Sequence, residues 1–161
     1  MTAPEANAAF HPEDIARSAI DRQLATCGWV VQSRADMNVG VSQGVAVREF
    51  QTDSGPVDYA LFVDRQLRGV IEAKAEGVTL SAFSEQAERY IAGAPAYLLR
   101  EKGQVRFEYV ASAREVLFRD HADPEPVSRR AFAFHRPETF ASTATANNAA
   151  ARSRTAARLS G

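Results

Sequence analysis

The chain has 161 residues, of which 45% are hydrophobic and 24% are charged, a composition typical of one globular domain with its own core. Its single cysteine, Cys27, excludes an internal disulfide, and no apolar run reaches the roughly 18–20 residues of a membrane span. The first residues lack the basic and apolar segments of a secretory signal, so we expect a cytoplasmic protein.

Charge is unevenly distributed along the chain. The formal net charge is −1, but the last 21 residues contain Arg152, Arg154 and Arg158 and no acidic residue. Residues 1–140 therefore hold 16 of the 19 basic residues and all 20 acidic residues, a net charge of −4. A body with this charge does not hold nucleic acid by bulk electrostatic attraction, so any DNA contact has to be local.

The first expected element is a helix that begins at Pro12 and ends at Gly28, after a flexible N-terminus over residues 1–11. Glu13 and Asp14 suit the positive end of its dipole. Its apolar residues recur at spacings that place them on one face. They are Ile15, Ala19, Ile20, Leu24 and Cys27.

Strand-like segments dominate the rest of the chain. Alternating or short apolar runs separated by polar turns predict strands. These runs are residues 29–32, 45–52, 56–63, 68–75, 94–100, 105–112 and 114–119, with a second amphipathic helix at 80–93. This order predicts an α/β fold, with a mixed β-sheet flanked by helices, over a core of residues 12–120. We expect an extended connector at 121–140 and a disordered low-complexity tail at 141–161.

Three charged residues interrupt the two most strand-like segments. Asp58 lies in the run at 56–63, and Glu72 and Lys74 lie in the run at 68–75, joined by a short turn at 64–67. Side chains two apart on a strand share a face, so Glu72 and Lys74 point the same way, and Asp58 shares its face with Ala60. If the two strands pair as a hairpin, Asp58 lies near Glu72 and Lys74.

A divalent cation gives this arrangement a chemical purpose. Two adjacent carboxylates repel each other unless a cation lies between them, and Mg²⁺ prefers oxygen ligands. A lysine beside the cation orients a water or stabilises negative charge in the transition state. The pattern therefore favours metal-dependent phosphodiester hydrolysis. The alternative is an ordinary solvated strand face, because Glu-x-Lys alone is common on exposed strands.

The second predicted helix carries Gln86 and Tyr90, four residues apart and therefore on the same side. They are candidates to orient a ligand or nucleotide near the charged strands. The alternative is a core aromatic residue with a glutamine at the border of the apolar stripe.

Taken together, these residues resemble the PD-(D/E)xK nuclease superfamily, in which an Asp, a Glu-x-Lys and a Gln-x-x-x-Tyr follow one another. A fuller set of segments resembles the N-terminal nuclease domain of the R (restriction) subunit of type I restriction enzymes. The segments are IDRQLATCGW, GVAVREF, DYALFVD, GVIEAKAEG, EQAERY and DPEPVSRRAFAFHRPETF.

The resemblance implies a restriction-endonuclease-like fold and a Mg²⁺-dependent DNA endonuclease, a hydrolase like the type I site-specific deoxyribonucleases. It implies that Asp58 and Glu72 bind the metal, together with the backbone carbonyl of Ala73, and that Lys74 is the catalytic lysine. Gln86 and Tyr90 correspond to the glutamine and tyrosine near the site in the family. Two readings of Glu49, on the preceding strand, stay open: a further acidic site residue or a structural one.

The resemblance also implies partners. Type I enzymes act on DNA together with methyltransferase and specificity subunits, and their R subunit carries an ATP-driven motor. The sequence contains no G-x-x-x-x-G-K-[ST] phosphate loop, so we expect ATP to act only in a motor region that this chain lacks. The alternatives are a truncated, non-catalytic domain that docks onto partner subunits, and another superfamily role such as DNA repair or RNA cleavage.

Overall fold

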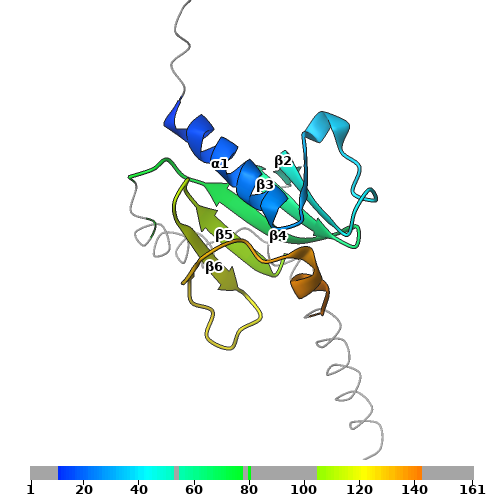
Figure 1. The fold of residues 1–161 in the computed structure, drawn as a ribbon. Helices are drawn as coiled ribbons and strands as arrows, with labels where there is room; N and C mark the ends of the chain where they lie inside the picture. The colour runs from blue at the N-terminus through cyan, green and yellow to red at the C-terminus, as the bar shows by residue number, and fades with distance from the viewer. Residues whose placement is uncertain (1–10, 53–54, 78–79, 81–104, 143–161) are drawn as a thin grey trace, which may run out of the picture.

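The computed structural model describes residues 11–52, 55–77, 80 and 105–142 (Figure 1). The elements in these ranges are α1 (Pro12–Thr26), β1 (Val30–Gln32), the 3₁₀ helix η1 (Arg34–Asp36), β2 (Gly44–Thr52), β3 (Gly55–Val63), β4 (Gln66–Ala73), β5 (Phe107–Ala111), β6 (Val116–Asp120) and β7 (Arg129–Ala131). No helix in these ranges is long and apolar enough to cross a lipid bilayer.

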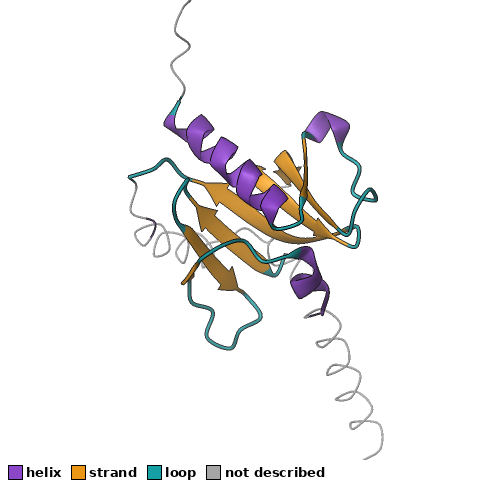
Figure 2. Cartoon of the chain, viewed as in Figure 1, coloured by secondary structure: helices purple, strands orange, loops and turns teal. Residues whose placement is uncertain are grey.

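The seven strands form one sheet in the order β1-β2-β3-β4-β5-β6-β7. The pairs β1–β2 and β4–β5 are parallel, and the other four neighbouring pairs are antiparallel. Helix α1 lies across one face of this mixed sheet (Figure 2). The predicted α/β fold with a mixed sheet is therefore confirmed. Most of the predicted helix at 80–93 and the whole strand at 94–100 lie outside the described residues, although Leu80 is helical and buried.

The main core fills the space between α1 and the sheet. Ile20 and Leu24 of α1 pack there with Tyr59, Leu61 and Ile71, all fully buried. A second, smaller cluster lies on the opposite face of the sheet. It contains Val45, Val47, Ala60 and Phe62, with Val39, Phe50, Val57 and Leu67 packed against it.

Helix α1 begins at Pro12 as predicted and ends at Thr26, just before Gly28, and its predicted apolar face is buried except at Ile15. Gly28 has φ +92°, a left-handed conformation that glycine adopts without strain after a helix end. Ile15, predicted to be buried, is 51% exposed, whereas Ala16 is fully buried. The buried stripe runs along Ala16, Ile20 and Leu24, at spacings of four residues, so Ile15 lies at its edge.

The hairpin between β3 and β4 turns at Asp64 and Arg65, which have φ values of 49° and 67°. Two consecutive residues with positive φ match the tight turn that suits the twist of a hairpin. The turn pairs Val63 with Gln66, and a register shift at Leu61/Phe62 then aligns Tyr59 with Ile71. Asp58 and Glu72 are the next residues along the two strands after this last pair.

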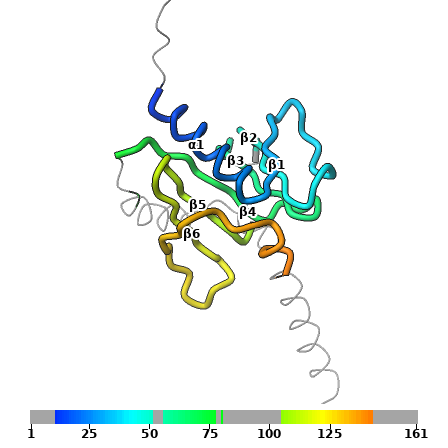
Figure 3. Tube along the Cα trace, in the orientation of Figure 1, coloured from blue at the N-terminus to red at the C-terminus, as the bar shows by residue number. Residues whose placement is uncertain are grey.

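Residues 121–142 pack back onto the sheet. They contribute strand β7 and a helical turn at 137–142, and Phe134 and Phe140 are 3% and 2% exposed. The segment runs from β6 back to the start of β2 (Figure 3), where Pro137 lies so close to Gly44 that a Cβ on this glycine would collide with its ring. The C-terminal part of the described chain therefore closes one end of the core.

Candidate active site

The middle of β2 and β3 departs from regular strand geometry. Glu49 has φ 50°, a left-handed conformation that costs a non-glycine residue free energy. On either side of this point, Arg48 pairs with Tyr59 and Phe50 pairs with Val57. Phe50 and Val57 pack with the small cluster on the far face, although strict alternation would place Val57 on the same face as Tyr59.

The break in alternation corrects one prediction about Asp58. We predicted that Asp58 shares the face of Ala60, but its carboxylate binds Arg17, which belongs to the helix on the other face. The reversal of side-chain direction next to Tyr59 explains the difference. Glu49 and Asp58 are thereby both brought to α1.

Arg17 joins the two acidic side chains. Its Nη2 donates a hydrogen bond to Oδ1 of Asp58 at 2.7 Å, and its Nη1 donates to Oε1 of Glu49 at 3.2 Å. The side chain of Asp58 is only 15% exposed, whereas that of Glu49 is 69% exposed. The guanidinium therefore makes one well-shielded ion pair and one solvent-screened pair.

A second donor fixes the other oxygen of Asp58. The backbone N–H of Ala73, in β4, donates to Oδ2 of Asp58 at 2.9 Å. This bond crosses from β3 to β4, so it ties the acidic side chain to the neighbouring strand. Asp58 is consequently held from two sides, by a helix side chain and by strand backbone.

Glu72 lies near Asp58, and Lys74 pairs with Glu72. Lys74 Nζ donates to Oε1 of Glu72 at 3.0 Å, and its backbone N–H donates to the carbonyl of Ala111 in β5. Partial burial raises the pKa of Glu72, and the nearby Asp58 carboxylate acts in the same direction, while the hydrogen bond from Lys74 opposes both. The two carboxylates therefore repel each other, and the lysine offsets part of this repulsion.

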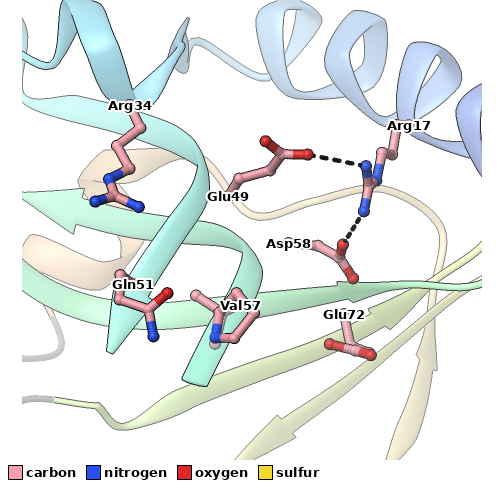
Figure 4. A pocket seen from close by; sticks show the side chains of 8 residues that line it. Arg17, Arg34, Glu49, Gln51, Val57, Asp58 and Glu72 are labelled. Carbon is pink, nitrogen blue, oxygen red and sulfur yellow. Dashed lines mark hydrogen bonds and ion pairs between the residues drawn. The ribbon is translucent and has the colours of Figure 1, made fainter. Parts of the chain in front are cut away.

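Asp58 and Glu72 line a pocket of about 450 Å³, together with Arg17 and Glu49 (Figure 4). Its acidic residues are Glu49, Asp58 and Glu72, and its basic residues are Arg17 and Arg34. In Figure 4, Arg17 lies beside Asp58 and Glu49, and Arg34 lies on the far side of the pocket. The pocket thus combines adjacent carboxylates with cationic side chains at an open surface.

Comparison with known families identifies the chain. Residues 34–115, about half of the sequence, match the family described as "Type I restriction enzyme EcoKI endonuclease subunit second domain". The chain belongs to this family. The matched segment includes Glu49, Asp58, Glu72 and Lys74, whereas Arg17 lies outside it. Most of the residues that line the charged pocket of this restriction-endonuclease-related domain therefore belong to the segment that matches the family.

One solved structure that resembles the domain is the type IIG restriction endonuclease BpuSI, with 17% sequence identity and a TM-score of 0.43. The match covers 83% of this chain and 15% of the BpuSI chain, so the domain spans a small part of that enzyme. No curated protein matches the sequence.

The structure places the predicted site residues of this restriction-endonuclease-related domain as follows. Asp58 and Glu72 line the pocket together, Lys74 donates to Glu72, and Arg17 links Glu49 to Asp58. Gln86 and Tyr90 lie outside the described residues. Within the described ranges, no group of three or more His, Cys, Asp or Glu side chains has a geometry that holds a metal ion.

The sequence did not predict the contacts of Arg17, nor the neighbouring hydrogen bonds of Asp21. One helical turn further on, Asp21 accepts hydrogen bonds from Arg48 Nη2 and from the hydroxyl of Tyr59, each at 2.7 Å. Burial, and the hydrogen bond to Asp21, raise the pKa of Tyr59. The i, i+4 spacing of Arg17 and Asp21 was the available signal, since it places both on one side of the helix.

Proposed function

We propose that this chain is the DNA-cleaving domain of a type I restriction enzyme, a Mg²⁺-dependent endonuclease that hydrolyses phosphodiester bonds. Asp58, Glu72 and Lys74 are the catalytic residues in this proposal. The observation that carries it is that Asp58 and Glu72 line one pocket and that Lys74 donates to Glu72 at 3.0 Å. Family membership supports it, because the matched segment contains all three residues.

The donor chemistry of the pocket fits a hard divalent cation. Asp58 and Glu72 offer carboxylate oxygens, and repulsion between them helps to raise the pKa of Glu72, which a bound cation would relieve. Each oxygen of Asp58 accepts one hydrogen bond, which leaves a lone pair on each for coordination. We propose the backbone carbonyl of Ala73 as a further ligand. A bound Mg²⁺ would polarise the phosphoryl group and lower the pKa of a bound water.

The protein residues contribute orientation and charge. The two hydrogen bonds on Asp58 fix its carboxylate before any ligand arrives, so little reorganisation is needed. The ammonium of Lys74 stands against Glu72, where we propose that it positions the attacking water or stabilises negative charge on the phosphoryl oxygens. Gln86 and Tyr90 are proposed to contact the nucleic acid near this pocket.

We propose DNA as the substrate and the methyltransferase and specificity subunits of a type I restriction complex as partners. The body of the chain, at a net charge of −4 over residues 1–140, offers little long-range attraction to DNA. Delivery of DNA by the rest of such a complex would compensate for this weak attraction.

The chain offers a matched control for the catalytic lysine. Its two lysines are Lys74 and Lys102. Plasmid nicking is measured at high protein concentration with Mg²⁺ or Mn²⁺ for the wild type, Lys74→Ala and Lys102→Ala. We expect nicking by the wild type and Lys102→Ala, and a loss of at least about 100-fold for Lys74→Ala. Nicking that survives Lys74→Ala contradicts the proposed role, and a folded wild type that binds no Mn²⁺ at millimolar concentration favours a non-catalytic docking domain.

A further inference from the structure

Arg17 occupies the position between two pocket carboxylates. Its two terminal nitrogens bind different acids, Asp58 at 2.7 Å and Glu49 at 3.2 Å. An arginine side chain stays protonated in proteins, so a permanent positive charge lies at this point of the pocket. Nothing in the family match accounts for it, because the match begins at residue 34.

The backbone of β2 supports this contact. Glu49 reaches the α1 side of the sheet through its left-handed conformation, which an L-residue adopts only at a cost. With regular strand geometry, Glu49 would point to the same face as Val47, away from α1. The local strain therefore brings a second carboxylate to Arg17, in addition to Asp58.

The charges of the pocket then separate into two groups. Glu49 and Asp58 share the positive charge of Arg17, and Glu72 pairs with Lys74. Asp58 belongs to both groups, since it also raises the pKa of Glu72 by repulsion. A divalent ion that binds Asp58 and Glu72 must consequently approach a carboxylate that already has a cationic partner.

We infer that Arg17 is a built-in counter-cation of the pocket: it neutralises Glu49 and Asp58, weakens the binding of a divalent ion, and takes the place that a second ion between these carboxylates would occupy. The inference rests on the proposed function, since it concerns the metal ligands Asp58 and Glu72. Arg17 is a positioning residue, because it acts through Asp58.

The inference predicts a gain in metal affinity when the charge is removed. A unit charge at close range changes the affinity of a divalent ion by about tenfold even in water. Arg17→Gln keeps a polar side chain but removes the positive charge, and the backbone N–H of Ala73 still donates a hydrogen bond to Asp58. We therefore expect Arg17→Gln to bind Mn²⁺ about tenfold more tightly than the wild type, and Arg17→Lys, which keeps the charge, to bind it like the wild type.

Arg48 provides the matched control. It also binds an acid across the α1–sheet contact, Asp21 at 2.7 Å, with a similar exposure of 41% against 35% for Arg17. It does not line the pocket. Arg48→Gln should therefore loosen the helix to a similar degree and leave Mn²⁺ affinity unchanged.

The experiment is calorimetric titration of the full chain with Mn²⁺, with folding of each variant verified by circular dichroism. Adding Glu49→Gln to Arg17→Gln should lower the Mn²⁺ affinity part of the way back to that of the wild type, because it removes one of the two carboxylates that Arg17 neutralises. Unchanged or weaker Mn²⁺ binding by folded Arg17→Gln overturns the inference, as does an equal gain in Arg48→Gln. If the folded wild type and Arg17→Gln both fail to bind Mn²⁺, the proposed function fails as well, which is a distinct result.

Discussion

Substitution of Asp58 should affect stability and cleavage through separate contacts. In Asp58→Ala, the backbone N–H of Ala73 and the guanidinium of Arg17 both lose an acceptor. Ala73 is 8% exposed, so water replaces its lost bond poorly. A hydrogen bond to a charged group contributes about 1.5–3 kcal/mol, and Arg17, which keeps Glu49 and solvent, adds less. We expect the free energy of unfolding to fall by about 3 kcal/mol.

Asp58→Asn separates the two effects. The amide oxygen can still accept from the N–H of Ala73, so we expect a loss of only about 1 kcal/mol. At about 2–4 °C per kcal/mol for a chain of this size, the melting temperature should fall by about 6–12 °C in Asp58→Ala and about 2–4 °C in Asp58→Asn. Thermal unfolding followed by circular dichroism in metal-free buffer measures both. A melting temperature of Asp58→Ala equal to that of the wild type would refute the two-sided hold on this carboxylate.

Three further predictions follow from other parts of the structure. Gly44→Ala should lower the free energy of unfolding by about 2 kcal/mol, because its Cβ would collide with Pro137, and urea denaturation measures the change. Burial raises the pKa of Asp120, but the ion pair with Arg106 outweighs it and lowers this pKa below the ordinary value of 3.8. The pair therefore stabilises the fold above pH 3.8, and its contribution is lost as the pH falls below that value. Asp120→Asn should reduce the loss of stability at acid pH, and an unchanged loss would contradict this prediction. Chelation of divalent ions with EDTA should abolish plasmid nicking, and excess Mg²⁺ should restore it.

Local sequence signals predicted much of the fold and the central pair of strands. The helix start at Pro12 and its end before Gly28 follow from capping chemistry, and the hairpin follows from two apolar runs joined by a short polar turn. Once the strands pair, alternation places Glu72 and Lys74 on one side, and the hairpin brings Asp58 near Glu72. These relations depend on residues at most 16 positions apart, which is why the sequence determines them.

The contacts of Arg17 could not be predicted in the same way. They join residues 32 and 41 positions apart and depend on how α1 packs on the sheet. They also depend on the left-handed conformation of Glu49, for which the sequence carries no glycine or asparagine signal. Strict alternation therefore placed Asp58 on the wrong face, since the reversal in β2 and β3 is a tertiary effect.

The variant Glu72→Gln distinguishes a metal-dependent cleavage site made of Asp58, Glu72 and Lys74 from an ordinary charged strand face. The Glu72 side chain is 48% exposed and hydrogen bonds to Lys74, so its loss leaves no buried group unpaired and the fold should be retained. Glu76→Gln is the control, since Glu76 has the same exposure and pairs with Arg114 outside the pocket. Plasmid nicking in Mg²⁺ should be equal for the wild type and Glu76→Gln and absent for Glu72→Gln. Nicking by Glu72→Gln at the wild-type rate would exclude Glu72 from the cleavage chemistry.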